Sequence, residues 1–372
     1  MLTISSDTRK GLVGVVVDET AISKATDTGT LIYRGYDIQD LVRHCSFKEV
    51  AYLILYGDLP TPAQLRAFQR KERSYREIDQ DLIAVIRQFP ATADPMARLR
   101  TAVSYLGMQD PQADDNNPEA NLEKAIKLLA RIPTIIATGY RFHTDQERIP
   151  PRQDISLAEN FFHMCFGRAP EKSILRCFDI SLILYAELGF GPSTFAARVV
   201  ASSLSDIYSA VTAAIGSLKG PLHGGANAGT MLTLQEIGEP ENVPAWVDNA
   251  LANKRTIIGF GHRIFKRGDP RVPILYNELQ YIAQQHKDAQ KWLNMQSQLA
   301  EILHKRKRLY SNLDSVAGLA YFLMGFPTAL ATPIFAMSRV TGWTAHVMEQ
   351  LAANKLIRPI GAYTGPGHRP IL

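Results

Sequence analysis

The chain has 372 residues, of which 46% are hydrophobic and 21% charged, as is ordinary for a globular protein with one large domain or with a large and a small one. No apolar run approaches the roughly 20 residues that a membrane span needs, and the N-terminus lacks the apolar core of a signal peptide. The net charge of +5 is not gathered on one arm, which fits an anionic small molecule at least as well as nucleic acid.

A short extended region is followed by helical patterns. Residues 13–17 are β-branched and residues 29–33 follow a Thr-Asp-Thr turn, so a ribbon of two short strands is expected near the N-terminus. Beyond it, Asp37 and Ser46 are predicted to cap helices, and Gly57 is predicted to end the second one. Further helices are expected from residue 61 into the seventies and over residues 80–89, 95–106, 122–143 with an interruption at Pro133, 154–165, 170–188, 193–215, 226–236, 244–254, 271–301, 315–325 and 332–354. Strands do not alternate with helices, so the predicted fold class is mainly α with a small N-terminal β-ribbon.

The three cysteines, Cys45, Cys165 and Cys177, are scattered and show no metal-binding spacing. We interpret them as reduced core residues of a cytoplasmic protein.

The stretch 220–229, which reads GPLHGGANAG, places His223 before two glycines and a helical pattern. The positive end of a helix dipole disfavours an imidazolium, so this histidine is expected to be neutral. A neutral imidazole that donates to a carbonyl oxygen suits enolisation chemistry, where an oxyanion develops. The alternative is a glycine-rich helix start that carries an incidental histidine.

Two other stretches carry candidate catalytic groups. In residues 259–271, GFGHRIFKRGDPR, His262 and Arg271 could meet at one anion, although a structural turn explains the pattern equally well. In residues 311–318, SNLDSVAG, Asp314 precedes a small apolar helix. Its carboxylate could cap that helix or act as a general base whose pKa is raised by burial.

Basic residues complete the set of candidates. Arg339, in SRVTGWTAH, and Arg358, in LIRP, lie beside apolar helices and need anionic partners, for which planar guanidinium groups suit carboxylates. The run at residues 305–308, KRKR, is either a solvated helix end or a phosphate-binding patch.

Together, GPLHGGAN, GFGHR with DPR, NLD with a following glycine, and SRVTGWTAH occur in the order and spacing of citrate synthases. The chain resembles this family from GLVGVVVDETAIS near its start to the C-terminal LIRP. It is most similar to the shorter prokaryotic members, which include 2-methylcitrate synthases.

The resemblance implies a mostly helical homodimer of two-domain subunits. Residues 1–224 and 326–372 would form the large domain, and residues 225–325 a small domain that closes over the substrates. It also implies that Asp314 takes a proton from the methyl group of acetyl-CoA and that neutral His223 stabilises the enol. His262 would polarise the ketone of oxaloacetate, and the resulting citryl-CoA would be hydrolysed.

The remaining site residues follow from the same resemblance. Arg271 and Arg339 match ligands of the oxaloacetate carboxylates, and Arg358 matches an arginine that enters the partner subunit's site. Lys266, Lys305 and Lys307 are candidate ligands of the phosphates of CoA. Acetyl-CoA would be a co-substrate, and no metal, redox cofactor, nucleic acid or membrane is implied.

Several residues depart from the family pattern. Where members usually carry a stretch like H-A-E-H-x-x-N-A-S-T-F, this chain has YAELGFGPSTF, which places Leu188 at the position of a histidine that donates to oxaloacetate. Gly191-Pro192 replaces an Asn-small pair, Ser311 a common proline, and residues 315–317 an aromatic pair with Ser. Tyr185 or a backbone N–H could supply the missing donor.

Three hypotheses follow: an active citrate synthase with a modified oxaloacetate site, a related condensation such as that of 2-methylcitrate synthase, or a weakly active structural or regulatory partner of another subunit.

Overall fold

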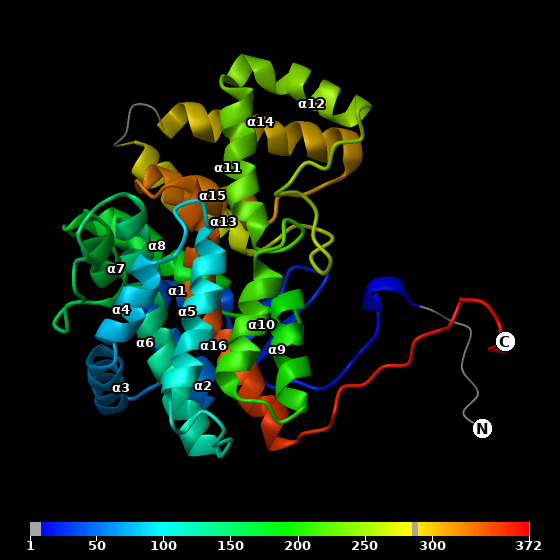
Figure 1. The fold of residues 1–372 in the computed structure, drawn as a ribbon. Helices are drawn as coiled ribbons and strands as arrows, with labels where there is room; N and C mark the ends of the chain where they lie inside the picture. Colours follow the sequence, from blue (N-terminus) through cyan, green and yellow to red (C-terminus); the bar gives the residue numbers. More distant parts are fainter. Residues whose placement is uncertain (1–8, 285–288, 372) are drawn as a thin grey trace.

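The computed structural model describes residues 9–284 and 289–371, and it is mainly helical, as predicted. Figure 1 shows a helical body with a smaller cap above it, in which α12 and α14 lie across the end of α11. The helices are α1 Ile38–His44, α2 Phe47–Tyr56, α3 Pro62–Ser74, α4 Gln80–Arg87, α5 Pro95–Gln109, α6 Pro118–His143, α7 Leu157–Phe166, α8 Lys172–Tyr185, α9 Pro192–Ser202, α10 Ile207–Leu218, α11 Gly225–Ile237, α12 Val243–Ala252, α13 Arg271–Ala283, α14 Ala289–Lys307, α15 Asp314–Leu323 and α16 Ala331–Ala352. Three short 3-10 turns are η1 Lys10–Leu12, η2 Pro240–Asn242 and η3 Thr328–Leu330.

The N-terminal sheet has three antiparallel strands in the order β1-β2-β3: β1 Ser23–Ala25, β2 Leu31–Tyr33 and β3 Tyr36–Asp37. The predicted strand near residues 29–33 is confirmed. The one predicted over residues 13–17 is wrong, because that segment pairs with no strand in the described part of the chain and Val16 is 88% exposed. A β-branched sequence favours a strand only where a neighbouring strand completes its hydrogen bonds.

The predicted helix caps are confirmed. The Asp37 carboxylate accepts from the Gln39 N–H, and Ser46 forms a reciprocal capping box with Glu49. Gly57 ends α2 in the left-handed conformation, which only glycine adopts at little cost. These signals are local in the sequence, so they are readable without knowledge of the fold.

Three predicted helices differ from the structure. α6 runs through Pro133 without interruption, because buried neighbours on both sides of the proline hold the helix together despite the lost hydrogen bond. The block 193–215 is two helices, since Leu204 takes a positive φ of 66° and Asp206 caps a new start. The block 271–301 is also two helices, α13 and α14, and positions 285–288 of it lie outside the described residues.

The body is organised around α16, which is buried along most of its length and packs against α6, α9, α10, α8 and α2. α11 leaves the body, contacts both α16 and α15, and reaches the cap (Figure 1). α13 and α15 lie beneath the cap and contact α8 of the body. Cys165 and Cys177 are buried and Cys45 is partly buried, all three as free thiols. Across residues 9–284 and 289–371, no helix is long and apolar enough to span a membrane.

Candidate active site

Several helix ends meet where the cap joins the body. α9, α11, α13 and α15 begin within three residues of Ser193, His223, Arg271 and Asp314. α8 ends there, and its last carbonyl groups, those of Leu184 and Tyr185, accept hydrogen bonds from Arg271 and Arg339 respectively. Helix N-termini are positive and C-termini negative, so this arrangement orients two guanidinium groups and surrounds them with donors. Such a place favours an anionic ligand.

His223 is held as a neutral imidazole in one tautomer. Its Nε2 lies 2.8 Å from the Ser193 hydroxyl and accepts from the Ser193 backbone N–H at 3.3 Å. The Ser193 hydroxyl accepts from the Trp343 indole N–H, which leaves its own hydrogen for His223. Nε2 is therefore the acceptor, and Nδ1 carries the hydrogen. Burial, with the nearby Arg339 charge, lowers the pKa of His223 to about 3.

The glycine after His223 has a steric role. A Cβ at Gly224 would lie 2.5 Å from the Leu218 side chain and 2.8 Å from its carbonyl oxygen. The chain can therefore pass the end of α10 this closely only with glycine at this position.

His262 is also neutral, but it is held by backbone groups. Its Nδ1 accepts from the N–H groups of Ile264 at 3.1 Å and Phe265 at 3.0 Å. Nε2 therefore carries the hydrogen and is the donor atom. Burial and the Arg271 charge lower the pKa of His262 to about 4, so it stays uncharged at neutral pH.

Asp314 is the first residue of α15, yet it does not cap the helix. Its carboxylate accepts instead from the Tyr185 hydroxyl at 2.6 Å, while its backbone N–H donates to the Asn312 side chain. Burial raises the pKa of Asp314 to about 6, and the hydrogen bond from Tyr185 limits this rise. The capping hypothesis is therefore wrong for the side chain, and the raised pKa is that expected of a general base.

Asn312 connects the segments of His262 and Asp314. The backbone N–H of Asn312 donates to the carbonyl of Gly259, and its side-chain NH₂ group donates to the carbonyl of Gly261 at 2.9 Å. Its side-chain oxygen accepts a hydrogen bond from the Asp314 backbone N–H. The two catalytic candidates thus sit on backbone segments that are tied to each other by one side chain.

The two buried arginines are held differently. Arg271 donates from Nε and Nη2 to the Asp269 carboxylate at 2.9 and 2.7 Å. Asp269 also accepts from the Leu313 N–H, next to Asp314. Arg339 donates from Nε to the backbone carbonyl of Tyr185 at the end of α8. No described residue accepts a hydrogen bond from its two terminal nitrogens. Arg339 therefore has the freer edge for a carboxylate ligand.

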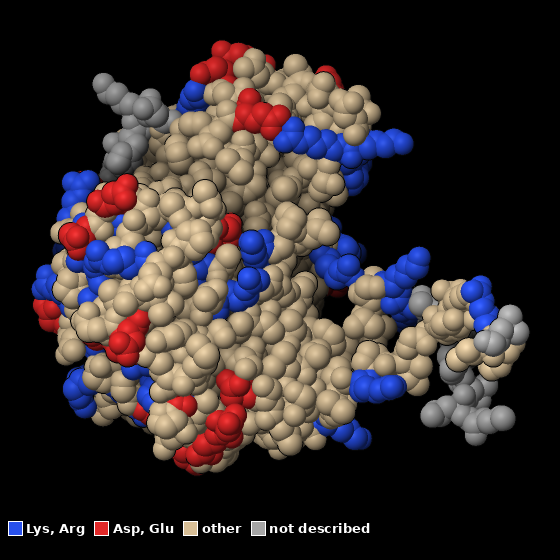
Figure 2. Space-filling model, viewed as in Figure 1, with Lys and Arg blue, Asp and Glu red and all other residues tan. Residues whose placement is uncertain are grey.

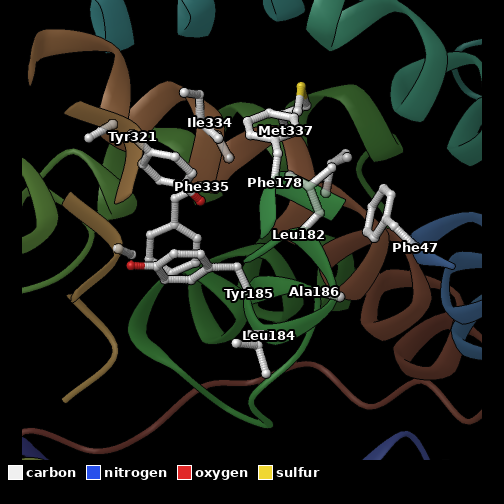
Figure 3. Close-up of a cluster of buried hydrophobic side chains, with 14 of the residues drawn as sticks. Phe47, Phe178, Leu182, Leu184, Tyr185, Ala186, Tyr321, Ile334, Phe335 and Met337 are labelled. Carbon is white, nitrogen blue, oxygen red and sulfur yellow. The ribbon is translucent and has the colours of Figure 1, made fainter. Parts of the chain in front are cut away.

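An aromatic wall links these groups. Figure 3 shows the rings of Tyr185 and Phe335 against each other, with centroids 3.9 Å apart. Phe335 also meets His223 edge to face and lies under the Arg339 guanidinium, 4.8 Å from its ring centre. The predicted residues His223, Asp314 and Arg339 are thus brought together through two aromatic side chains.

The other predicted ligands lie farther out. Lys266 donates to the carbonyl of His262, so it stands at the edge of the site. Lys305 pairs with Glu301 at the end of α14, and Lys307 is exposed there. Arg358 is exposed on the C-terminal segment that follows α16, and this segment leads away from the helical body (Figure 1).

The segment 187–193 keeps a firm framework in spite of its unusual sequence. Fully buried Glu187 accepts from His346 Nε2 and from the Ser23 hydroxyl, both at 2.9 Å. A Cβ at Gly191 would lie 3.9 Å from Arg339 Nη1, so the absence of a side chain there leaves space beside that guanidinium. Leu188 is partly buried, and the Tyr185 hydroxyl is engaged by Asp314 rather than available as a substitute donor.

Comparison with known proteins identifies the family of the chain. The family model described as citrate synthase, C-terminal domain, matches residues 11–360. The chain belongs to the citrate synthase family. It is 49% identical to a citrate synthase of Mycolicibacterium smegmatis, over 98% of this chain and 96% of that one. It is also 49% identical to a 2-methylcitrate synthase of Mycobacterium tuberculosis, over 98% and 92% of the two chains.

Solved citrate synthase structures share the fold. One from Thermoplasma acidophilum, in a ternary complex with carboxymethyl coenzyme A and oxaloacetate, superposes with a TM-score of 0.95 at 33% identity and covers 99% of both chains. That from Thermotoga maritima has a TM-score of 0.89 at 38% identity and covers 98% of both. Family and fold are those of condensing enzymes of the transferase class.

The sequence did not predict the contacts that support the catalytic candidates, although it did raise Tyr185 as a possible donor to oxaloacetate. Tyr185, Ser193 and Phe335 come from α8, α9 and α16, and nothing in their local sequence indicates contact with Asp314 or His223. Asn312 could have been found, since an amide two residues before a candidate base at a helix start is itself a capping signal.

Proposed function

We propose that this citrate synthase family member condenses acetyl-CoA with oxaloacetate and releases citrate and CoA. The observation that carries the proposal is geometric: Tyr185 holds one oxygen of the buried Asp314 carboxylate, and each histidine has one ring nitrogen engaged as an acceptor, so its other nitrogen is an N–H donor. The raised pKa of Asp314 and the lowered pKa values of His223 and His262 agree with this arrangement. A weak carbon acid needs such a base together with neutral donors that stabilise the oxygen of its enol.

The geometry suggests the roles of the three groups. Asp314 removes a proton from the methyl group of acetyl-CoA, and His223 Nδ1–H donates to the thioester oxygen as the enol forms. The enol carbon attacks the ketone carbon of oxaloacetate, whose oxygen accepts a hydrogen bond from His262 Nε2–H as it becomes an alkoxide. Water then hydrolyses the thioester of citryl-CoA. Burial of these groups strengthens every interaction with the developing charge.

Arginines would position the oxo acid. Arg339 offers two terminal nitrogens that form no hydrogen bond with residues 9–284 or 289–371, and Arg271 adds positive charge, although Asp269 neutralises much of it. The phosphates of CoA would lie toward Lys266 and the end of α14, because residues 309–311 run beside residues 259–261 and bring both basic segments to one side. Figure 2 shows lysine and arginine side chains around the hollow on that side of the molecule.

We further propose that residues 225–325 form a small domain that rotates on the large domain of residues 1–224 and 326–372, with hinges near Gly224-Gly225 and Gly325. Asp314, His262 and Arg271 belong to the former, whereas Tyr185, Ser193 and Arg339 belong to the latter. Closure would complete the site and exclude water. Small-angle scattering should show compaction on addition of oxaloacetate, and an unchanged radius of gyration would contradict this rotation.

A homodimer is the proposed assembly. The outer sides of α5, α9 and α10 form an almost uncharged face (Figure 2). Small and apolar residues at least partly exposed on it are Thr101, Ser104, Met108, Val199, Ser209, Thr212, Ala213 and Ser217. The extended C-terminal segment with Arg358 would embrace the partner and bring that arginine to its site. Light scattering at micromolar concentration should give a dimer, and a fully active monomer would contradict the proposal.

The proposed location is the cytoplasm, where thiols stay reduced, because the three cysteines are free thiols.

A second candidate is 2-methylcitrate synthesis, because relatives at the same 49% identity carry both names. We would measure CoA release with acetyl-, propionyl- and butyryl-CoA, each with oxaloacetate, and compare kcat/KM. The proposal expects acetyl-CoA to give the highest value. A higher value with propionyl-CoA would favour the second candidate, and no release with any of them would indicate a structural or regulatory role.

A further inference from the structure

The hydrogen bond from Tyr185 is the only one that the Asp314 carboxylate forms with a described side chain. Tyr185 Oη lies 2.6 Å from Asp314 Oδ1. No described group donates to Oδ2, so one carboxylate oxygen is occupied and the other is left to accept a proton. The tyrosine is 1% exposed and ends α8, where its own carbonyl accepts from Arg339.

We infer that Tyr185 is a positioning residue for the base: it fixes the Asp314 carboxylate through Oδ1, directs Oδ2 at the substrate, and keeps the carboxylate ionised at neutral pH. This rests on the proposed function, in which Asp314 is the proton acceptor. Tyr185 touches no reacting atom in this role and acts through Asp314 alone.

The chemistry of the pair supports a permanent donor. Burial raises the pKa of Tyr185 well above its usual value, so the phenol keeps its hydrogen throughout the working range of pH. Its ring is clamped by Phe335, and Arg339 holds its backbone carbonyl, so the hydroxyl has little freedom to turn away (Figure 3). A hydrogen bond to a carboxylate favours the ionised form, which opposes the effect of burial.

The other groups around Asp314 act in both directions. The pKa of Asp314 is lowered by Arg271 of α13 and by Arg339 of α16, and it is raised by Asp269 in the turn before α13. α11 and α14 face α15 through Asn227 and Gln296, which do not titrate. All of these neighbours remain in place when the Tyr185 hydroxyl alone is removed, so the effect of that hydroxyl can be measured separately.

The test compares Tyr185→Phe with a matched control, Tyr321→Phe. Tyr321 is another buried tyrosine, on α15, and its hydroxyl donates a hydrogen bond to Ser181 of α8 and not to Asp314. A hydrogen bond to a charged group is worth about one to two pH units, so the acid limb of kcat should move upward by that amount in Tyr185→Phe. At pH 7 this corresponds to about a two- to tenfold loss of kcat that recovers at higher pH. The limb should stay in place in Tyr321→Phe.

A second measurement does not depend on turnover. The Asp314 carboxyl is titrated by ¹³C NMR in protein labelled at aspartate, with Asp314→Asn used to assign its signal. Its midpoint should rise in Tyr185→Phe and stay in Tyr321→Phe. If that shift occurs but no variant releases CoA, the proposed function fails and the positioning role stands.

A third variant protects against poor folding of Tyr185→Phe. Tyr185→3,5-difluorotyrosine preserves the shape and strengthens the donor, so it should move the acid limb and the carboxyl midpoint downward. Equal loss of kcat at every pH with both midpoints unmoved would show that Tyr185 serves packing only, and would overturn the inference.

Discussion

The site is built from two regions that differ in how many hydrogen-bonding side chains they contain. The segments 259–271 and 309–314, which carry His262 and Asp314, tie their polar groups into a continuous network through Asn312 and Asp269. The segment 187–193, across from them, contributes Leu188 and glycines where side-chain donors could stand. In the first region, many hydrogen bonds therefore fix the positions of the catalytic candidates. In the second, the backbone is held in place, while the side chains that would face a ligand can change.

The framework of the second region explains why it tolerates such residues. Glu187 is anchored by His346 and Ser23, and the Tyr33 hydroxyl donates to its backbone carbonyl. Burial would raise the pKa of Glu187, but the neighbouring His346 and Arg339 lower it. The contacts of Glu187 thus fix the shape of this segment. A substitution at Leu188 or Gly191 is therefore expected to alter the affinity for the substrate without unfolding the site.

The strongest test of the first region is Asp314→Asn. An amide cannot accept the methyl proton, so we expect kcat to fall by about 10²- to 10⁴-fold. The fold should survive, because the amide oxygen can still accept from Tyr185. Steady-state CoA release measures the effect, with circular dichroism and thermal melting as controls. Near-normal turnover in a folded variant would remove Asp314 from its assigned role.

Prediction from sequence succeeded for this region where signals were local. Glycines beside His223 and His262, and an aspartate at a helix start, are visible in short stretches, and the structure places His223 and Asp314 at helix ends near the junction of body and cap. The contact between Tyr185 and Asp314 joins residues 129 positions apart, and only the packing of α8 on α15 creates it. Continuity of α6 through Pro133 was unpredictable for the same reason: the buried surroundings outweigh the local preference.

A paired substitution compares the two arginines. Arg339→Ala removes the guanidinium with free nitrogens, so KM for oxaloacetate should rise by about a hundredfold. Arg271→Ala leaves the Asp269 carboxylate buried without its main partner, and should lower the free energy of unfolding by about 3–5 kcal/mol. The double variant Arg271→Ala, Asp269→Asn should regain part of that stability. Denaturant unfolding and steady-state kinetics together check this, and an unchanged stability in Arg271→Ala would contradict it.

The pH dependence of kcat is a milder test of the same network. Asp314 must be ionised to act, and its pKa is raised to about 6, so activity should fall as the pH drops through 6. One unit below this value about a tenth of the carboxylate remains ionised, which gives roughly a tenfold loss. The histidines titrate near 3 and 4 and should not shape this limb. A limb near pH 4 would show that the carboxylate is not buried as described.

The smallest expected effect probes the second region through Leu188→His. Leucine cannot donate a hydrogen bond, and the Tyr185 hydroxyl is engaged by Asp314, so the oxo acid is expected to lack one donor. A hydrogen bond to a charged group contributes about 1.5–3 kcal/mol, equivalent to roughly 10- to 150-fold in affinity, as an upper bound on the gain.

Because Gly191-Pro192 stands in place of the family's Asn-small pair, the gain should fall short of this bound, and we expect KM for oxaloacetate to fall by several-fold at saturating acetyl-CoA. Leu188→Gln is the matched control, since it adds polarity without an imidazole. If KM stays constant or rises in folded Leu188→His, then a backbone N–H already serves the ketone or the pocket accommodates another oxo acid. The acyl-CoA series repeated with other 2-oxo acids separates those two explanations, because only the second yields a better substrate than oxaloacetate.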